Sequence, residues 1–469
     1  MRSRLSQMAV VLAACLLLPS SFCRRASAVS EQAPEIEAQD LLVQYLRIDT
    51  TNPPGNEAEG ARFLQRTLGK EGIEAVLVGS DPRRQGVYAR LKSGSTAPAL
   101  LLLHHIDVVP ANAATWSVAP FSGQRSAGYI WGRGALDIKS LGIAELMAVL
   151  DLKRRRVALS RDVIFLACGD EERGGEAGIK ALLKDNPALF ENVGFVLNEG
   201  GANETIVDRV SFFGIQIDEK VPLWVKISTR GMAGHSALPP DDGGAIGNLL
   251  LSIRQVMEIP RPYRVTPSVR QYFAALAPAK PGEKGRLLAN IDASLQSPRF
   301  ESVLSASYRS LLRDTVAVTE IHGGDSANSL PSTAWASLDF RLLPDTSVDG
   351  TIAEIRKRLA PHSELDILLR SDPAPPSPKD SPLYKVLQNR MHASDPGSLV
   401  GPIVSAGTSD NRYFRQRGVI AYGFSPFKVN YYDADSVHGV DERIRARFFD
   451  QGVRLTRKIV TDFCAAADR

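Results

Sequence analysis

Histidine and carboxylate side chains gather in five short segments of the chain. The segments contain His104, His105 and Asp107; Asp137; Asp170, Glu171 and Glu172; Glu199; and His438, Asp441 and Glu442. Imidazole nitrogens and carboxylate oxygens, with no thiolate among them, suit Zn²⁺, and Co²⁺ and Mn²⁺ are alternatives. A single segment of this kind is more often a turn or a solvated loop, but five in one domain are hard to explain as turns. The residue types therefore indicate a metal site.

Continuous apolar runs come directly before three of these segments. Residues 99–103, 162–167 and 193–197 are such runs, and residues 419–424 form a fourth. Runs without alternation are typical of strands that are covered on both faces of a mostly parallel sheet. The sequence therefore predicts buried strands that end at the candidate ligands.

Helical patterns separate these strands, at residues 58–68, 140–152 and 177–183. Strands that alternate with helices predict an α/β fold: a mostly parallel sheet with helices on both faces. In such open sheets, functional groups collect beyond the carboxyl ends of the strands. The candidate ligands follow the strands, as this rule requires.

The pattern changes between residues 222 and 372. Leu223 and Val225 alternate with polar or larger neighbours, and Leu338 and Phe340 do the same. Period-two alternation marks strands with one face in a core and the other face accessible. The sequence therefore predicts a second, antiparallel α+β domain inserted into the first.

These patterns set the expected domain boundaries. We expect a catalytic domain over residues 35–221 and 373–469, and an inserted lid domain over residues 222–372. A Pro-rich stretch at 372–378 is typical of a linker and is expected to return the chain to the first domain. Within the lid, residues 265–312 are expected to shape the substrate pocket.

The amino-terminal residues predict an export signal. Residues 1–28 contain basic residues, an apolar run at 8–18 and a small-residue site that ends at Ala28, as a secretory signal peptide does. We therefore expect a periplasmic or secreted protein. An uncleaved leader, or a lipid on Cys15 or Cys23, would instead anchor it to a membrane. After cleavage only Cys168 and Cys464 remain, which excludes a disulfide framework.

The charge balance argues against nucleic acid as a partner. The 469 residues include 56 Lys and Arg and 52 Asp and Glu. Four of the arginines and none of the acids lie in residues 1–28, so the remaining chain carries no net charge. A chain without net charge does not indicate general binding to nucleic acid or to an anionic membrane surface. A composition of 44% hydrophobic and 23% charged residues is ordinary for a globular protein and excludes collagen, coiled-coil and disordered classes.

The motifs and their order resemble a known enzyme family. The motifs are the segments around Asp107 to Pro110, Trp116 to Gly123, Gly132-Arg133-Gly134, Glu199-Gly200-Gly201 and His438-Gly439. Together they resemble the dinuclear zinc aminoacylase/carboxypeptidase family, metallopeptidase family M20. The similarity extends from about Thr50 to Glu442. It is strongest to the branch that contains Gly-Xaa carboxypeptidase and N-fatty-acyl-amino-acid synthase/hydrolase.

The resemblance implies two zinc ions per chain and a set of ligands. His105 would bind one ion and His438 the other, and Asp137 would bridge both. Glu199 would complete the first site and Glu172 the second.

The resemblance also implies roles for two further carboxylates beside the ligands. Asp107 would accept a hydrogen bond from the imidazole of His105 and fix its tautomer. Glu171 would be the general base that takes a proton from water and passes it to the leaving amine. The family tends to have a cis peptide bond after the bridging aspartate, here between Asp137 and Ile138.

Substrate contacts are implied mostly in the lid. His235 would stabilise the oxyanion of the tetrahedral intermediate, often from the lid of a partner subunit, which makes a homodimer through the lid an expectation. Asn328 and Arg341 match substrate-binding positions, and Gly407 opens a loop that resembles the family's carboxylate-binding loop. The alternative for Arg341 is a salt bridge to Asp339.

The sequence therefore predicts a metal-dependent hydrolase. Its substrate would be a peptide or an N-acyl amino acid, cleaved at the amide bond to an amino acid with a free carboxylate. Carboxypeptidase and N-acyl amino acid hydrolase remain open as alternatives. A noncatalytic binding protein on the same scaffold is the alternative from another class.

Overall fold

The computed structural model describes residues 34–206 and 208–467. The expected export signal, residues 1–28, lies outside the described residues and stays a prediction. Among the described helices, none is both long enough and apolar enough to cross a bilayer.

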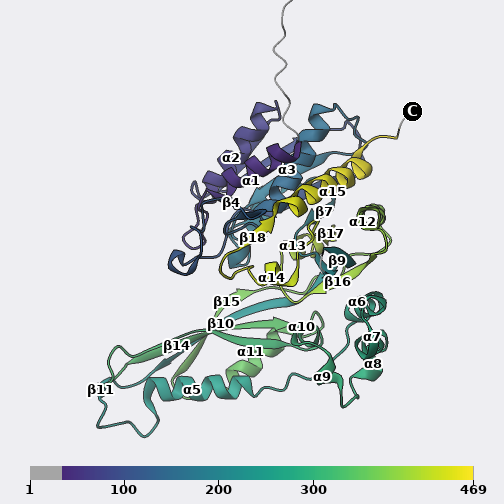
Figure 1. The fold of residues 1–469 in the computed structure, drawn as a ribbon. Coiled ribbons are helices and arrows are strands. Elements are labelled where there is room, and N and C mark those ends of the chain that lie inside the picture. The colour runs from purple at the N-terminus through teal and green to yellow at the C-terminus, as the bar shows by residue number, and fades with distance from the viewer. Residues whose placement is uncertain (1–33, 207, 468–469) are drawn as a thin grey trace, which may run out of the picture. The chain divides into compact units, whose positions relative to one another are not determined.

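A nine-stranded sheet forms the centre of the first domain (Figure 1). In spatial order its strands are β1 (Ala75–Val78), β2 (Gly86–Leu91), β6 (Val163–Cys168), β3 (Ala99–His105), β7 (Val193–Asn198), β17 (Ile420–Gly423), β9 (Arg209–Glu219) and β16 (Leu399–Ser405), with β8 (Ala202–Ile206) paired to β9. The central strands β6, β3, β7 and β17 are parallel, whereas β1, β2 and β8 pair in antiparallel fashion. The predicted strands are confirmed to within about two residues at each end.

Strand β3 shows why its sequence does not alternate. Leu100 and Leu102 pack in one hydrophobic cluster, while Leu101 and Leu103 pack in another on the opposite face. Successive side chains of a strand point to opposite faces. Both faces of this strand are covered, so residues 99–103 are all apolar.

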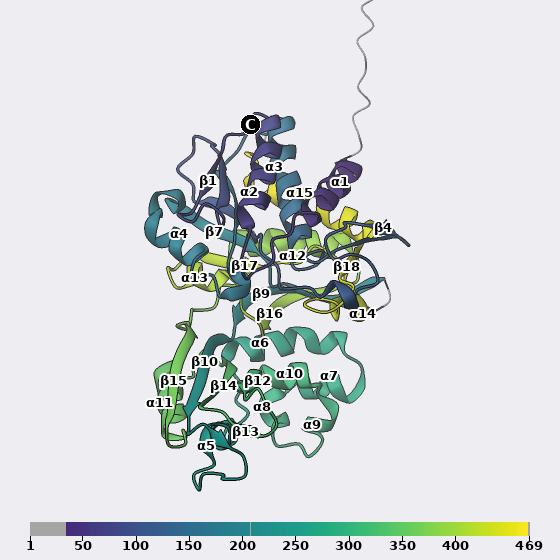
Figure 2. The same cartoon turned by 90° about the vertical axis from the view of Figure 1, so that its left-hand side faces the viewer.

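Helices cover both faces of the main sheet (Figure 2). One cluster contains α1 (Pro34–Leu46), α2 (Glu57–Lys70), α3 (Lys139–Arg154), α12 (Pro382–Ser394) and α15 (Ala446–Cys464). The other contains α4 (Ile179–Asp185) and α13 (Asn411–Arg415). The short helix α14 (Tyr431–Ala434) and a small sheet of β4 (Arg125–Ser126), β5 (Tyr129–Trp131) and β18 (Arg443–Arg445) complete this domain. The predicted α/β class is confirmed.

The inserted segment forms its own antiparallel sheet. In spatial order the strands are β12 (Thr315–Gly323), β14 (Thr333–Leu342), β10 (Val221–Arg230) and β15 (Ser363–Arg370). The predicted alternation is confirmed, because Leu223, Val225, Leu338 and Phe340 are all buried against α5 (Gly244–Met257) and α11 (Val348–Lys357). A second small sheet pairs β11 (Gly234–His235) with β13 (Ser329–Leu330).

Helices make up most of the segment between residues 265 and 312, and its expected role in shaping the substrate pocket stays a prediction. The helices are α6 (Pro267–Leu276), α7 (Gly282–Ala289), α8 (Ile291–Ser294), α9 (Phe300–Val303) and α10 (Ala306–Ser310). Their core includes Phe212, Ile403 and Val404, which belong to the main sheet. Much of this segment therefore packs on strands of the first domain and not on the lid sheet. The exact domain boundaries stay a prediction.

Candidate metal centre

The five predicted metal ligands come from element ends that meet at one edge of the main sheet. His105 is the last residue of β3, and Glu199 directly follows β7. Glu172 lies in a short turn after β6, Asp137 just before α3, and His438 after α14. Because β3, β6 and β7 are parallel neighbours, their carboxyl ends lie at the same edge.

The ligand atoms form two groups that share Asp137. His105, Asp137 and Glu199 make one group and Asp137, Glu172 and His438 the other, with ligand atoms within 4.8 Å of one another in each. Nε2 of His105 lies 3.1 Å from Oδ1 of Asp137, and Nε2 of His438 lies 3.0 Å from Oδ2. The two oxygens of one carboxylate therefore face two different imidazoles. The Asp137–Ile138 peptide bond is cis, as the resemblance implied.

The two glutamates offer further oxygens to the centre. Oε1 of Glu199 lies 3.7 Å from Nε2 of His105, and Oε2 of Glu172 lies 3.2 Å from Nε2 of His438. Oε1 of Glu199 and Oε1 of Glu172 are buried, and neither has a hydrogen-bond partner among the described residues. Buried carboxylate oxygens need a donor or a cation. The residues therefore fit two divalent metal ions with nitrogen and oxygen ligands.

The pKa values in the centre reflect this crowding of charge. Burial raises the pKa of Glu199 to about 8. Hydrogen bonds to Asp137 and Glu172 raise the pKa of His438 to about 10. Burial and then the charge of Glu199 hold the pKa of Glu171 well above its ordinary value. Carboxylates concentrated in this way would be stabilised by cations.

The contact predicted for Asp107 requires a correction. Nδ1 of His105 bonds the main-chain carbonyl of Asp107 at 2.8 Å, whereas the carboxylate lies 3.7 Å away. The carboxylate instead accepts the backbone N–H groups of Glu171 and Glu172, both at 3.2 Å, and Nδ2 of Asn52 at 2.9 Å. The carbonyl thus fixes the imidazole, and the carboxylate holds the turn that carries the predicted base and a predicted ligand.

Sequence reasoning gave no role to several residues that hold the centre in place. Asp170 has a φ of +73°. Its carboxylate accepts hydrogen bonds from the backbone N–H of Ala177 and from the guanidinium of Arg84, and these contacts shape the turn before Glu171. Arg133 and Glu442 connect the loop of Asp137 to the loop of His438. Their only signal in the sequence was their position inside motifs next to predicted ligands.

The predicted substrate residues Arg341 and Gly407 are close to one another. Arg341 points away from the lid core, as its alternation with the buried Phe340 predicts. Its guanidinium pairs with Asp339 at 2.9 Å, and Nη1 donates to Oγ1 of Thr408 at 3.1 Å. The salt bridge considered as the alternative is therefore present, and the same guanidinium also reaches the residue after Gly407.

The other two predicted substrate residues form a separate pair in the lid. His235 in β11 pairs with Ser329 in β13, and the backbone N–H of Ser236 bonds the carbonyl of Asn328 at 3.3 Å. Both His235 and Asn328 are exposed. Figure 1 shows β11 at the tip of the lid sheet. Among the described residues, the metal groups include neither of them.

His104 is a core residue, which supports leaving it out of the ligand set. Its side chain is fully buried, and Nδ1 lies 3.1 Å from Oε2 of Glu145. Nε2 lies 3.4 Å from the hydroxyl of Tyr45. Burial lowers the pKa of His104 to about 3, so the imidazole is neutral.

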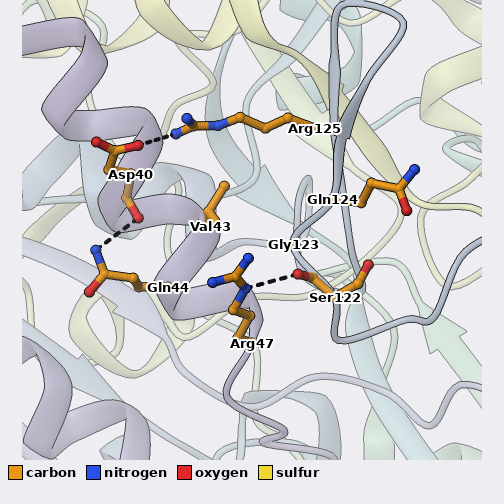
Figure 3. Close-up of a pocket in the computed structure, with 8 residues that line it drawn as sticks. All are labelled: Asp40, Val43, Gln44, Arg47, Ser122, Gly123, Gln124 and Arg125. Atoms are coloured by element: carbon orange, nitrogen blue, oxygen red, sulfur yellow. Dashed lines mark hydrogen bonds and ion pairs between the residues drawn. The ribbon is translucent and has the colours of Figure 1, made fainter.

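A surface hollow lies between α1 and the chain before β4 (Figure 3). Its lining is Asp40, Val43, Gln44, Arg47, Ser122, Gly123, Gln124 and Arg125. Arg125 pairs with Asp40 at 2.7 Å, and Arg47 donates to the carbonyl of Ser122 at 3.0 Å. Both guanidinium groups therefore bind the protein itself. None of the predicted site residues lines this hollow.

Comparison with known proteins gives relatives over most of the chain. It is 32% identical over 356 residues to N-fatty-acyl-amino acid synthase/hydrolase PM20D1 of Xenopus tropicalis, covering 73% of this chain and 68% of that protein. It is 27% identical over 447 residues to human aminoacylase-1, covering 92% and 97% of the two chains.

Solved structures share the fold. The crystal structure of an M20 family metallo-carboxypeptidase from Sulfolobus solfataricus matches with a TM-score of 0.73 and 21% identity, covering 91% of this chain and 99% of that one. The structure of human carnosine dipeptidase 1 matches with a TM-score of 0.72 and 16% identity, covering 92% of this chain and 96% of that one.

The family match covers the elements that build the centre. The model of peptidase family M20/M25/M40 matches residues 101–462, from within β3 to near the end of α15. That range contains all five residues of the two candidate metal groups. The protein is accordingly a hydrolytic enzyme. The chain belongs to the M20/M25/M40 peptidase family.

Proposed function

We propose that this enzyme is a dinuclear zinc hydrolase of amides, in which the amine product is an amino acid with a free carboxylate. The observation that carries the proposal is Asp137, whose two oxygens face His105 and His438 at 3.1 and 3.0 Å. A carboxylate shared in this way suits a bridging ligand between two metal ions. Co²⁺ or Mn²⁺ would also accept these ligands.

The residues around the centre divide the chemistry between them. Two divalent ions held by these ligands would lower the pKa of water and polarise the substrate carbonyl. Glu171 is partly buried beside the ligands, and Asp107 holds its backbone. It would take the proton of the attacking water and deliver it to the leaving amine, as a general acid–base residue does.

The lid supplies the groups that would hold the substrate. Arg341 can offer its guanidinium to the substrate carboxylate beside the Gly407 loop, since it already reaches Thr408 there. Asn328 and His235 would complete the pocket from the tip of a lid. His235 would donate to the developing oxyanion.

The exposed position of His235 leads us to propose that it acts across a homodimer. Strand β12 is an edge of the lid sheet, and its residues Val318 and Ile321 are exposed. Leu250 and Met257 of α5 are also exposed. An exposed apolar edge strand is a surface that a second chain can cover. A partner seated there would bring a second lid to the pocket.

A substrate screen tests the proposed activity. The zinc-loaded enzyme should hydrolyse members of two panels, N-acyl amino acids and dipeptides, and the panel with the higher kcat/KM would identify the substrate class. The similar proteins include an N-fatty-acyl-amino acid synthase/hydrolase and a carnosine dipeptidase, whose names correspond to the two panels. Matched substrates with an amidated carboxylate should react poorly.

Two controls make this test decisive. Removing the metal with a chelator should abolish hydrolysis, and zinc should restore it. Glu171→Gln should lower kcat by about 100- to 10000-fold while two zinc ions stay bound. Full activity without metal, or full activity of Glu171→Gln, would contradict the proposed mechanism.

A further inference from the structure

A buried carboxylate next to the candidate centre gathers four hydrogen bonds. Oε1 of Glu442 accepts the backbone N–H groups of Leu136 at 2.7 Å and Asp137 at 3.0 Å. Oε2 accepts Nη1 of Arg133 at 2.7 Å and the backbone N–H of Gly134 at 3.0 Å. Glu442 is fully buried, so all of its hydrogen bonds are made to protein.

The backbone around Asp137 is shaped to fit this carboxylate. Gly134 has φ +88°, and a Cβ there would come within 2.9 Å of Cγ1 of Val108. Glycine is the residue that adopts this conformation without strain. Consecutive N–H groups that converge on one anion form a nest, which here encloses a side chain of the same protein.

Arg133 extends the contact to the second loop. Its side chain is buried, with the guanidinium 5.1 Å from the ring centroid of Trp116. Nη2 donates to the carbonyl of Gly439 at 2.7 Å, directly after His438. The loop that carries Asp137 is therefore tied through Arg133 and Glu442 to the loop that carries His438.

We propose that Glu442 and Arg133 are positioning residues that set the distance between Asp137 and His438 for metal binding. The inference rests on the proposed two-metal centre, since it explains how the shared ligand is held. Neither side chain belongs to the ligand groups themselves. Each acts through the backbone of a neighbouring ligand, as supporting hydrogen bonds around metal sites do.

Two substitutions separate the two halves of this connection. Glu442→Gln keeps the shape but replaces one oxygen by an NH₂ group, which would face N–H donors and push the Asp137 loop away. Arg133→Met removes the contact to Gly439 but leaves the three backbone bonds of Glu442 in place. Asp441→Asn is the matched control, because Asp441 lies in the same loop and bonds Ser117 instead of the Asp137 loop.

The readout is metal affinity, measured by equilibrium dialysis of the full chain against a graded zinc chelator, with the bound zinc counted by atomic emission. Glu442→Gln should lower the affinity for both zinc ions about 10- to 100-fold, because Asp137 belongs to both ligand groups. Arg133→Met should lower the affinity mainly for one zinc ion, the one that His438 and Glu172 would bind. Asp441→Asn should bind both zinc ions with the affinity of the wild type. The visible absorption of the cobalt-loaded forms should change in the first two variants and not in the third.

Stability is measured separately by thermal unfolding of the metal-free proteins. Glu442→Gln with wild-type zinc affinity and cobalt spectrum would overturn the inference, and so would equal losses in Glu442→Gln and Asp441→Asn. If Glu442→Gln does not fold, Arg133→Met carries the test, and unchanged binding of both ions by that variant would overturn the inference. Failure of the wild type to bind two ions would instead contradict the proposed function.

Discussion

Asp107 shows how one carboxylate can serve the candidate centre without touching a metal ion. Its two oxygens accept the backbone N–H groups of Glu171 and Glu172, and its carbonyl accepts from His105. Three residues that we place in the reaction therefore depend on a single side chain and its backbone. Burial is the main cause that raises the pKa of Asp107, and the charge of His105 and then the hydrogen bond from Asn52 oppose this shift.

Asp107→Asn should lower kcat about 10- to 100-fold while leaving the fold intact. The amide keeps one oxygen, but its NH₂ group would face a backbone N–H, so the turn of Glu171 would move. Asp162→Asn is a suitable control, since Asp162 also accepts a backbone N–H, that of Ser93 at 2.8 Å, at the other end of β6. Steady-state kinetics and zinc content of both variants check this, and equal activity of the two would rule out the role given to Asp107.

Four of the five candidate ligands could be located from the sequence because they lie at the end of a predicted strand or just before a predicted helix, whereas His438 lies in the loop after α14 and was indicated only by the motif His438-Gly439. The partners of Asp107 could not, since a carboxylate two residues after a ligand can reach either the imidazole or a neighbouring turn. The contact of Arg133 with Glu442 joins residues 309 positions apart. No local pattern encodes such a contact.

At the scale of elements, β14 links the lid to the first domain. Arg341 near its end pairs with Asp339 and also donates to Thr408, in the loop after β16. Alternation with Phe340 was enough to predict the face of Arg341. The packing of α6 on β16 was not predictable, because an apolar helix face does not specify which apolar surface covers it.

Arg341→Ala should raise KM for substrates with a free carboxylate about 10- to 100-fold, the loss expected for a hydrogen bond to a charged group of about 1.5–3 kcal/mol. Values of kcat should change little, and substrates with an amidated carboxylate should be unaffected. Arg230→Ala on β10 is the control, as Arg230 is an exposed arginine of the same sheet. An unchanged KM in Arg341→Ala would remove this residue from the pocket.

At the scale of the whole molecule, the question is how His235 reaches the centre. Strand β11, which contains His235, pairs with β13, which directly follows Asn328, at the tip of the lid, and the side chain of His235 is exposed. The candidate metal ligands and the proposed base come from the first domain, so the proposed pocket needs a lid from the same chain or from a partner. The exposed residues of β12 and α5 favour the partner.

Co-expression of two inactive variants tests this arrangement. Glu171→Gln lacks the base, and His235→Ala should lose about 100- to 1000-fold in kcat, as enzymes that lose an oxyanion donor do. In a dimer of one chain of each kind, purified through two different tags, the chain that carries His235→Ala would keep Glu171 and receive an intact His235 from its partner. One of the two pockets would be complete, so activity should recover to about half of the wild type per dimer. A dimer of two differently tagged Glu171→Gln chains should stay inactive. If the mixed dimer is also inactive, or if sedimentation shows a monomer, His235 does not act between chains.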